Sequence, residues 1–387
     1  MKIIPYGRQD ITQEDVDSVI KVLKSDFITQ GPSINLFEES LRNYTKANFV
    51  SVLNSATSAL HISCLALGVG KDDIVWTSAN TFVASANCAL YCGARVDFVD
   101  IDPLTNNICV NSLEEKLIKA QKSGNLPKVV IPVHLTGQSC KMNEIYNLSL
   151  KYGFSIIEDA SHAIGGHYEN HLVGSCKYSD ITVFSFHPVK IITTGEGGAA
   201  HTNSKDLHDK IKLLLSHGIT KEPSVVDPEL NGLWYYEQFD LGYNYRMTDI
   251  QAALGVSQIK RLDKIIKDRN RIAKRYDAEL KQLPIKIPTV IDECLSSRHL
   301  YVIRLNVEEI DHTHKEIFKD LRKNGIGVNL HYIPVYYHPY YKKMGFKKGY
   351  CPESEKYHNE AISIPIYPTL SESDQTRVID VLTKIVK

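Results

Sequence analysis

The chain has 387 residues, more than one ordinary hydrophobic core needs, and suits a large domain followed by a smaller one. Its 45 Lys and Arg residues balance 45 Asp and Glu residues, so no overall positive field is available to bind nucleic acid or an anionic membrane. The opening residues lack an apolar signal segment, and no apolar run approaches a membrane span. The eight cysteines show no zinc-ligand or redox spacing, so we expect free thiols in a cytoplasmic protein.

The first predicted element is an amphipathic helix over residues 12–25, which a capping box of Thr12 and Asp15 opens. From residue 49 onward, short apolar runs alternate with helical segments, of which two are expected at 57–67 and 82–92. The runs are strand candidates and lie at 49–53, 73–77, 96–100, 129–134, 154–159 and 181–186. Strands rich in Val and Ile that alternate with helices predict an α/β fold with a mostly parallel sheet covered on both faces.

The second half of the chain has a different pattern. A charged helical stretch from residue 249 to about residue 280 suggests a connector between two domains. A strand candidate at 299–307 and helices near 313–323 and 373–386 then predict a smaller C-terminal α+β domain. We therefore place a large domain with an N-terminal arm at residues 1–250, and the connector with the small domain at 251–387.

Two charged residues follow strand candidates, where open α/β sheets bind their ligands. Asp159 ends the run FSIIED, and a carboxylate there can pair with a protonated pyridine nitrogen and keep a cofactor ring electron-poor. Lys190 comes after the run ITVFSF and a short loop, where its amine can form a Schiff base and move protons. Without a ligand, Asp159 could instead cap the next helix, and Lys190 could be a solvated surface lysine.

Small and hydroxyl-bearing residues form candidate anion sites near these charges. The segment NSATSA at 54–59 joins a strand to a helix, and the free N–H groups and dipole of a helix N-terminus bind anions. Ser185 can present a hydroxyl to an anion bound there, such as the phosphate of a cofactor. The glycine-dense run TTGEGG at 193–198 would let the backbone approach a ligand closely. Ordinary N-capping and a plain tight turn are the alternatives.

Together these segments resemble the fold-type I enzymes that use pyridoxal 5'-phosphate (PLP), and specifically the sugar-nucleotide aminotransferases of the DegT/DnrJ/EryC1/StrS family. The resemblance covers almost the whole chain. It rests on the segments IPYGRQDIT, DFITQGPSINLFEE, NSATSALH, TFVASANCALYCGARVDFVDID, EDASHAIGG, FSFHPVKIITTGEGG, LLLSHGI, LGYNYRMTDIQAALG and HYIPVYYHPYY. It implies PLP as the cofactor and a fold-type I architecture of one large and one smaller domain.

The resemblance also implies a role for individual residues. Lys190 would bind the cofactor covalently and act as general acid and base, and Asp159 would pair with the pyridine nitrogen. His162, where many relatives carry Gln, would approach the 3-hydroxyl of the cofactor. Phe82 would stack on the ring, although a core aromatic is the alternative. The implied phosphate contacts are Ala56, Thr57 and Ser185 of the same chain and Asn244 of a neighbouring subunit.

On the substrate side, the segment HYIPVYYHPYYKK at 331–343 could stack a uracil base and bind sugar oxygens, or could instead pack as an aromatic domain interface. Three segments are similar to transaminases that aminate C4 of a UDP-linked 4-keto-6-deoxy-N-acetylhexosamine, with L-glutamate as donor, in pseudaminic acid biosynthesis. The resemblance also implies a homodimer with shared active sites. The substrate-side residues that it implies are Tyr6, Thr29, Gly31, His217 and His331.

Other functions remain open or are disfavoured by particular residues. A different nucleotide-linked keto-sugar, aminated at C3 or C4 and carried by TDP or GDP, stays open. A PLP-dependent sugar dehydratase would have His in place of Lys190, and a non-catalytic regulator would have lost the cofactor residues. A dinucleotide oxidoreductase would need a G-x-G-x-x-G segment after a strand, which the sequence lacks. No metal is expected, because the histidines show no metal-ligand spacing.

Overall fold

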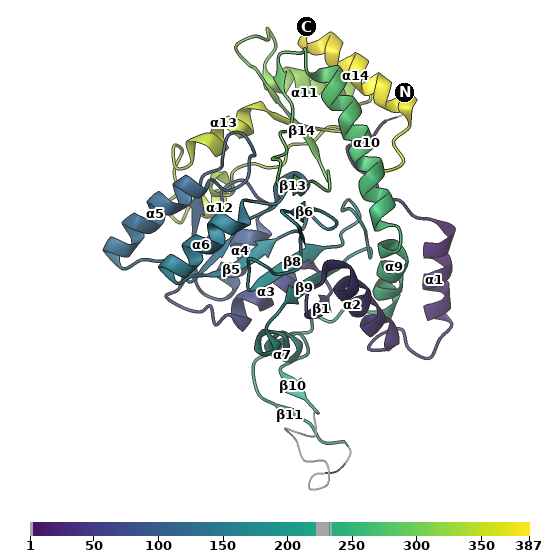
Figure 1. The fold of residues 1–387 in the computed structure, drawn as a ribbon, viewed down its shortest axis with the longest axis vertical. Coiled ribbons are helices and arrows are strands. Elements are labelled where there is room, and N and C mark those ends of the chain that lie inside the picture. Colours follow the sequence, from purple (N-terminus) through teal and green to yellow (C-terminus); the bar gives the residue numbers. More distant parts are fainter. Residues whose placement is uncertain (1–2, 222–231, 233) are drawn as a thin grey trace.

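The computed structural model describes residues 3–221, 232 and 234–387, and a seven-stranded sheet forms its centre (Figure 1). The strand order is β1-β9-β8-β5-β4-β2-β3. The pairs from β8 through β3 are parallel, whereas β9 is antiparallel to both β8 and β1. The strands are β1 (Phe49–Leu53), β2 (Ile74–Ser78), β3 (Arg95–Val99), β4 (Val129–Ile131), β5 (Ser155–Asp159), β8 (Ile181–Ser185) and β9 (Gly198–Thr202). The predicted mostly parallel sheet is confirmed.

Six of these strands coincide with predicted strands, with ends that differ by a few residues. The seventh, β9, is not predicted, because its sequence GAAHT continues the glycine-dense run and lacks the Val and Ile residues that favour strands. The run TTGEGG therefore does more than approach a ligand, since its last glycine begins a fully buried strand.

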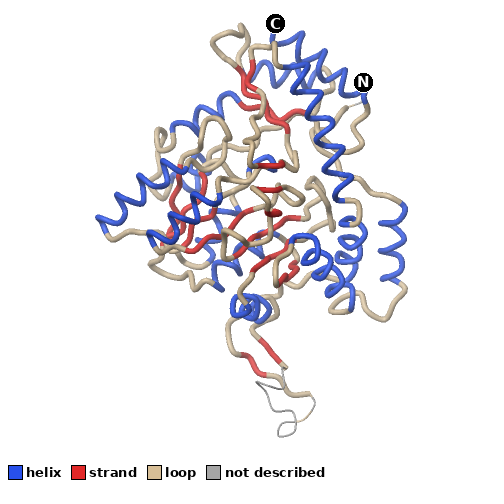
Figure 2. Tube along the Cα trace, viewed as in Figure 1, coloured by secondary structure: helices blue, strands red, loops and turns tan. Residues whose placement is uncertain are grey.

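Helices cover both faces of the sheet, as the tube view shows (Figure 2). One face carries α3 (Ala56–Ala66), α4 (Ala84–Tyr91) and α7 (Lys205–Leu214). The other face carries α2 (Pro32–Thr45), α5 (Val110–Ser123), α6 (Met142–Tyr152) and α9 (Asp249–Ile259). Successive strand residues point to opposite faces of the sheet, so Ile157 packs on the face that α3 and α4 cover and Ile156 on the face that α5 and α6 cover.

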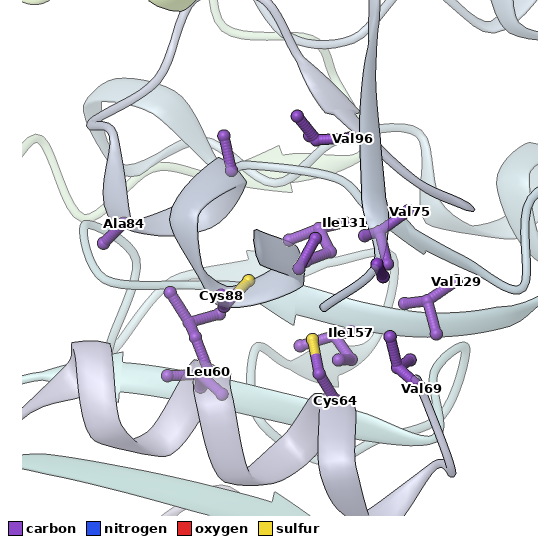
Figure 3. Close-up of a cluster of buried hydrophobic side chains, with 14 of the residues drawn as sticks. Leu60, Cys64, Val69, Val75, Ala84, Cys88, Val96, Val129, Ile131 and Ile157 are labelled. Atoms are coloured by element: carbon purple, nitrogen blue, oxygen red, sulfur yellow. The ribbon is translucent and has the colours of Figure 1, made fainter. Parts of the chain in front are cut away.

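Figure 3 shows the core between α3, α4 and the sheet. Leu60 and Cys64 of α3 and Cys88 of α4 face Val75, Ile131 and Ile157 of the strands. All of these side chains are buried. Burying one large aliphatic side chain of this kind contributes about 1.5–3 kcal/mol. This core fixes the first turn of α3 and the end of β5, which both border the candidate site.

A second sheet lies towards the C-terminal part of the chain. It contains β12 (Ile285–Lys286), β14 (Tyr301–Leu305) and β15 (Ala361–Ile364), all antiparallel. Its core is shared with α10 (Leu262–Leu280), α11 (His314–Lys323), α14 (Glu372–Val386) and Ile4 from the N-terminal arm. The strand and the two helices predicted here are confirmed. The division into domains at residue 250 stays a prediction.

Two further helical predictions have different outcomes. Helix α1 (Gln13–Leu23) begins at the predicted capping box, in which the Thr12 N–H donates to the Asp15 carboxylate at 2.9 Å. The predicted single connector helix is wrong, because α9 and α10 are separate helices that break at Arg261. At this break the guanidinium of Arg261 forms ion pairs of 2.7 Å with both Asp10 and Asp15, which ties α1 to the junction.

The remaining elements are short. A hairpin of β10 (Ile219–Thr220) and β11 (Glu237–Gln238) projects away from the rest of the molecule (Figure 1). A three-stranded sheet joins β6 (His167–Tyr168), β7 (His171–Leu172) and β13 (Cys294–Leu295). The helical turns are η1 (Leu135–Gly137), η2 (Val335–Tyr337), α12 (Pro339–Lys342) and α13 (Pro352–Glu360).

Within the described residues, no helix combines the length and the apolar character needed to cross a bilayer.

Candidate active site

A cavity of about 580 Å³ lies at the carboxyl ends of β5 and β8, where open α/β sheets bind ligands. Asp159 is the last residue of β5 and Ser185 is the last of β8, and these strands are neighbours. The lining residues are Tyr6, Ser55, Ala56, Thr57, Leu60, Thr81, Phe82, Ala84, Val133, Asp159, Ser161, His162, Ser185, His187, Val189, Lys190, Glu196, His299, Asn329, Leu330, His331 and Tyr332.

Nine residues predicted for the site lie together around this cavity. We refer to them as the cavity group: Tyr6, Ala56, Thr57, Phe82, Asp159, His162, Ser185, Lys190 and His331. They come from the N-terminal arm, from α3, from the ends of β5 and β8, and from the segment before η2. The fold thus brings together residues that are more than 300 positions apart in the sequence.

Asp159 is buried and is held by three hydrogen bonds. The Ser85 hydroxyl donates to Oδ2 at 2.6 Å, while the backbone N–H and the hydroxyl of Ser161 donate to Oδ1 at 3.1 and 2.6 Å. A carboxylate that accepts several hydrogen bonds is fixed in its orientation. Neither serine was predicted from the sequence. Ser161 carries a local signal, since an Asp often binds the backbone two residues later, but Ser85 lies 74 positions away on α4 and carries none.

Lys190 sits on the same cavity wall, in a turn where its N–H donates to the His187 carbonyl at 2.9 Å. Desolvation lowers the pKa of its amine to about 8, although the nearby Asp159 carboxylate acts in the opposite direction. Burial disfavours the charged form of an amine, and a neighbouring carboxylate favours it. A substantial fraction of the amine is therefore neutral near physiological pH, which is the form that attacks a carbonyl.

The N-terminus of α3 forms an anion cradle beside these residues. Ser55 caps the helix by accepting from the Ser58 N–H at 3.1 Å, and the N–H groups of the first turn have no partner within the helix. Ala56, Thr57 and Ser185 all line the cavity. Gly198 packs under this turn, since a Cβ there would lie 2.5 Å from the Ala56 nitrogen. A phosphate suits the free N–H groups and the positive end of the helix dipole.

Phe82 and His162 define the middle of the cavity. Phe82 precedes α4 and is 57% exposed, so it is not a core aromatic. His162 is buried, and its Nδ1 accepts from the Thr136 N–H at 3.3 Å while its Nε2 lies 3.1 Å from the Tyr332 hydroxyl. Burial, and then the charge of Lys190, hold the pKa of His162 well below its usual range. The imidazole is therefore neutral.

Two further histidines form one wall of the cavity. His299 lies with its ring centroid 4.4 Å from that of His162, and its Nδ1 is buried without a partner among the described residues. His331 pairs with the Ser363 hydroxyl at 2.7 Å, and its ring lies 5.2 Å from that of Tyr6. Burial, and then Lys190, lower the pKa of His331 to about 3. Neutral imidazoles offer both a donor and an acceptor, which suits hydroxyl groups of a sugar.

These residues fit PLP. The cavity offers a partly neutral lysine amine, an oriented carboxylate, an exposed aromatic ring and a helix N-terminus with free N–H groups. These would serve, respectively, the aldehyde carbon, the ring nitrogen, the ring face and the phosphate of that cofactor. The unpartnered nitrogen of His299 and the cradle kept open by Gly198 are features that a bound ligand explains.

The other four predicted residues lie elsewhere. We call Thr29, Gly31, His217 and Asn244 the edge group, because they lie around the start of α9 and the base of the hairpin. Thr29 pairs with Thr248, the Gly31 N–H donates to Asp249 at 2.7 Å, and Asn244 pairs with Ser216. The His217 N–H donates to the Tyr243 carbonyl at 2.9 Å. None of the four is among the described residues that line the cavity of their own chain.

The tyrosine-rich segment 331–343 divides into two parts. His331 and Tyr332 line the cavity, whereas Tyr336 and Tyr341 are buried in the core of the large sheet, with rings 5.9 and 5.8 Å from that of Phe98. The aromatic interface that the sequence left as an alternative is therefore correct for Tyr336 and Tyr341.

Known proteins have sequences similar to this chain. A UDP-4-amino-4,6-dideoxy-N-acetyl-beta-L-altrosamine transaminase of Campylobacter jejuni is 41% identical over 389 residues, which cover 100% of this chain and 98% of the relative. A spore coat polysaccharide biosynthesis protein of Bacillus subtilis is 37% identical over 387 residues, which cover 99% of this chain and 97% of the relative.

Solved structures are similar as well. PseC of Helicobacter pylori, an aminotransferase involved in the biosynthesis of pseudoaminic acid, superimposes with a TM-score of 0.90 at 31% identity, covering 100% of this chain and 99% of that one. The PLP form of a putative sugar aminotransferase from Streptococcus pneumoniae gives a TM-score of 0.88 at 29% identity, covering 99% and 98%. Residues 9–383 match the DegT/DnrJ/EryC1/StrS aminotransferase family, and the protein is therefore a PLP-dependent aminotransferase that belongs to this family.

Proposed function

We propose that the protein transfers the amino group of L-glutamate to C4 of a UDP-linked 4-keto-6-deoxy-N-acetylhexosamine, as in pseudaminic acid biosynthesis. The observation that carries the proposal is one cavity that holds a desolvated lysine amine, an oriented carboxylate and a helix N-terminus with free N–H groups. The 41% identical relative is named as a UDP-sugar transaminase, which supports a nucleotide sugar as substrate.

In this proposal, Lys190 and Asp159 carry the chemistry. When bound, PLP supplies an electron sink for the carbon that bears the amino group. The Lys190 amine, with a pKa of about 8, would move the proton of the α carbon of the amino donor to the cofactor, and in the second half-reaction it would move a proton from the cofactor to C4 of the sugar. The Asp159 carboxylate, oriented by Ser85 and Ser161, holds a positive charge at the ring nitrogen throughout.

The walls of the cavity orient the substrates and exclude water. Phe82 and Leu330 provide apolar surface, and the neutral imidazole of His299, whose Nδ1 has no partner among the described residues, offers a hydrogen bond to a sugar oxygen. Tyr6 is held in place because its carbonyl accepts from the Ile366 N–H at 3.0 Å, which links the N-terminal arm to the second sheet.

We further infer that the enzyme is a cytoplasmic homodimer in which the edge group of one subunit completes the cavity of its partner. Asn244 is exposed, and its neighbours explain why: the rings of Tyr243 and Tyr245 stack on each other and lie against His61, at 4.9 and 6.0 Å. Alternate residues of an extended segment point to opposite sides, so Asn244 faces outwards. In a two-fold dimer each contact forms twice, so the Asn244 surface of each subunit can lie against the cavity of the other.

The test is a spectroscopic and product assay. The purified protein loaded with PLP is mixed with L-glutamate and then with UDP-linked 4-keto-6-deoxy-N-acetylhexosamines, with TDP- and GDP-linked ketones as comparison. We expect the visible absorbance of the lysine-bound cofactor to disappear with glutamate and return with the UDP-linked ketone, together with a 4-amino sugar. Preference for another carrier would overturn the substrate assignment. Loss of water at C3 without amine incorporation would indicate a dehydratase, and an absent visible band would indicate a non-catalytic protein.

A further inference from the structure

Tyr332 is a cavity residue to which the predicted site gives no role. Its N–H donates to Oδ1 of Asn80 at 3.0 Å, and the Tyr357 hydroxyl donates to the preceding carbonyl, that of His331, at 2.8 Å. Its ring lies 6.1 Å from the rings of both Phe82 and His162. The residue is therefore anchored through its backbone, and its hydroxyl has a fixed position in the cavity.

The hydrogen bonds around His162 determine which atom carries the proton. The Thr136 N–H donates to Nδ1 at 3.3 Å, so Nδ1 must be the acceptor nitrogen of a neutral imidazole. The proton then lies on Nε2, which is 3.1 Å from the Tyr332 hydroxyl. Nε2 therefore donates to the Tyr332 oxygen, and the reverse direction is excluded as long as Thr136 holds Nδ1.

This direction leaves the proton of Tyr332 free for another acceptor. Within the described part of the chain, His162 is the one partner found for the Tyr332 hydroxyl. Burial, and then the Asp159 carboxylate, raise the pKa of Tyr332 far above its usual value, so the hydroxyl stays protonated and remains a donor. The cavity thus contains a fixed O–H group whose acceptor must come from a ligand.

The charged groups near Tyr332 and His162 indicate which ligand atom accepts the proton of the Tyr332 hydroxyl. The charge of Asp159 acts on Tyr332, and the charge of Lys190 acts on His162. All four residues line one cavity, so the pair borders the same space as the carboxylate that serves the ring nitrogen and the amine that serves the aldehyde carbon. On PLP, the ionised 3-oxygen lies on the ring between these two positions, and it is the anionic ring oxygen that most needs a donor.

We propose that the Tyr332 hydroxyl is a hydrogen-bond donor to the ring 3-oxygen of PLP, with His162 and the Thr136 N–H as the positioning groups that direct its proton. The proposal rests on the proposed function and adds a residue to it. It also gives His162 a defined task, which is to hold Tyr332 as a donor in place of the direct contact with the 3-hydroxyl that the resemblance implies.

The experiment compares the PLP-loaded wild type with Tyr332→Phe. The pH titration of the visible absorbance reports the pKa of the linkage between Lys190 and the cofactor. Removing a donor makes the 3-oxygen more basic and strengthens its hold on the linkage proton, so we expect the midpoint to rise by about one unit. We also expect PLP to dissociate about tenfold more readily, which equilibrium dialysis measures without any turnover.

Variants of His162 test the same series of hydrogen bonds, from the Thr136 N–H through His162 to Tyr332, without changing Tyr332 itself. His162→Gln keeps one acceptor for Thr136 and one donor for Tyr332, and it should retain a midpoint near that of the wild type. His162→Leu should reproduce the shift of Tyr332→Phe, and the double variant should shift no further, because the two residues act in one chain. Tyr340→Phe removes a hydroxyl from a tyrosine that is 58% exposed and provides the matched control.

The outcomes separate this inference from the proposed function. An unmoved midpoint and unchanged PLP binding in Tyr332→Phe, beside a normal wild-type band, would overturn the inference alone. A higher KM for the keto-sugar without a spectral change would also overturn it, since the hydroxyl would then serve the substrate. No visible band in the wild type would overturn the proposed function, and this inference with it. If Tyr332→Phe does not fold, the Gln and Leu variants of His162 decide.

Discussion

The cavity group and the edge group contain residues predicted for one site, yet the fold keeps them apart. Residues of the cavity group meet because the parallel strands β5 and β8 and the helix α3 end at the same edge of the sheet. Residues of the edge group are held around the start of α9, where Asp249 accepts from the Gly31 N–H at 2.7 Å and the Ser33 N–H at 2.9 Å. The first group needs one chain, whereas in the proposed dimer a second chain supplies the second group.

The surroundings of the two groups differ in the same way. Asp159, His162 and Ser185 are buried, and their partners fix them without any help from outside the chain. Asn244 is exposed, and Gly31 borders a separate cavity of about 290 Å³ that Arg246 also lines. Changes in the cavity group should therefore disable the subunit that carries them, while changes in the edge group should act on the partner.

The largest effect is expected for Lys190→Ala. Without the amine, neither covalent attachment of PLP nor proton transfer at the substrate carbon can occur, so turnover and the visible band should both disappear. Absorbance spectra and an amine-transfer assay measure the two losses. Lys267→Ala, on the exposed face of α10, is the control that should retain both. A visible band in Lys190→Ala would show that another lysine binds the cofactor.

The next largest effect is expected for Asp159→Asn. The amide keeps the shape of the side chain and removes its charge, so the ring nitrogen loses its ionic partner. Turnover should fall by about 100-fold or more, the scale on which loss of one preorganised electrostatic contact acts. Thermal unfolding should change far less than turnover. A variant with near-wild-type turnover would remove Asp159 from the mechanism.

The cavity group was within reach of sequence reasoning because its signals are local. Asp159 and Lys190 each follow an apolar run, and the carboxyl ends of parallel strands share one edge. Ser85, Tyr332 and Thr136 carry no such signal, since each acts through a hydrogen bond to a residue between 26 and 170 positions away. The strand β9 could not be predicted from the sequence for a different reason. Its residues have little strand propensity, and they form a strand because they are buried between β1 and β8.

The edge group marks a second limit of the sequence. The resemblance implied that Asn244 serves a neighbouring subunit, but it did not assign Thr29, Gly31 and His217 to either copy. The break between α9 and α10 also lacks a local signal. At this break the Arg261 guanidinium pairs with Asp10 and Asp15, about 250 positions earlier in the sequence, and no local pattern encodes that contact.

A hybrid dimer tests whether the edge group serves the cavity of the partner subunit. Asn244→Ala alone should weaken PLP binding about tenfold, as expected for loss of one hydrogen bond to a charged phosphate. Subunits carrying Lys190→Ala and subunits carrying Asn244→Ala are then co-expressed with different tags, and the hybrid is purified through both. If Asn244 serves the partner, one of the two sites contains only native residues, and activity should reach about half that of the wild type.

The result is distinct when Asn244 serves its own subunit. Each site of the hybrid then contains one substitution, so activity stays at or below half that of the Asn244→Ala dimer. A monomeric protein that is fully active would contradict the shared site directly. The hybrid is therefore decisive even though each single variant is impaired.

The smallest effect expected concerns the pH at which the apo-enzyme captures PLP. Desolvation lowers the pKa of the Lys190 amine to about 8, so capture, followed by the rise of the visible band, should accelerate with pH up to about 8 and then level off. The Asp159 carboxylate raises this pKa, so Asp159→Asn should move the midpoint to lower pH. Glu196→Gln makes the same chemical change on an exposed residue of the same cavity and is the matched control. A midpoint near 10.5, the ordinary value for lysine, would mean that the cavity group does not desolvate the Lys190 amine. It would contradict the view that the residues of one subunit alone prepare this lysine for its reaction.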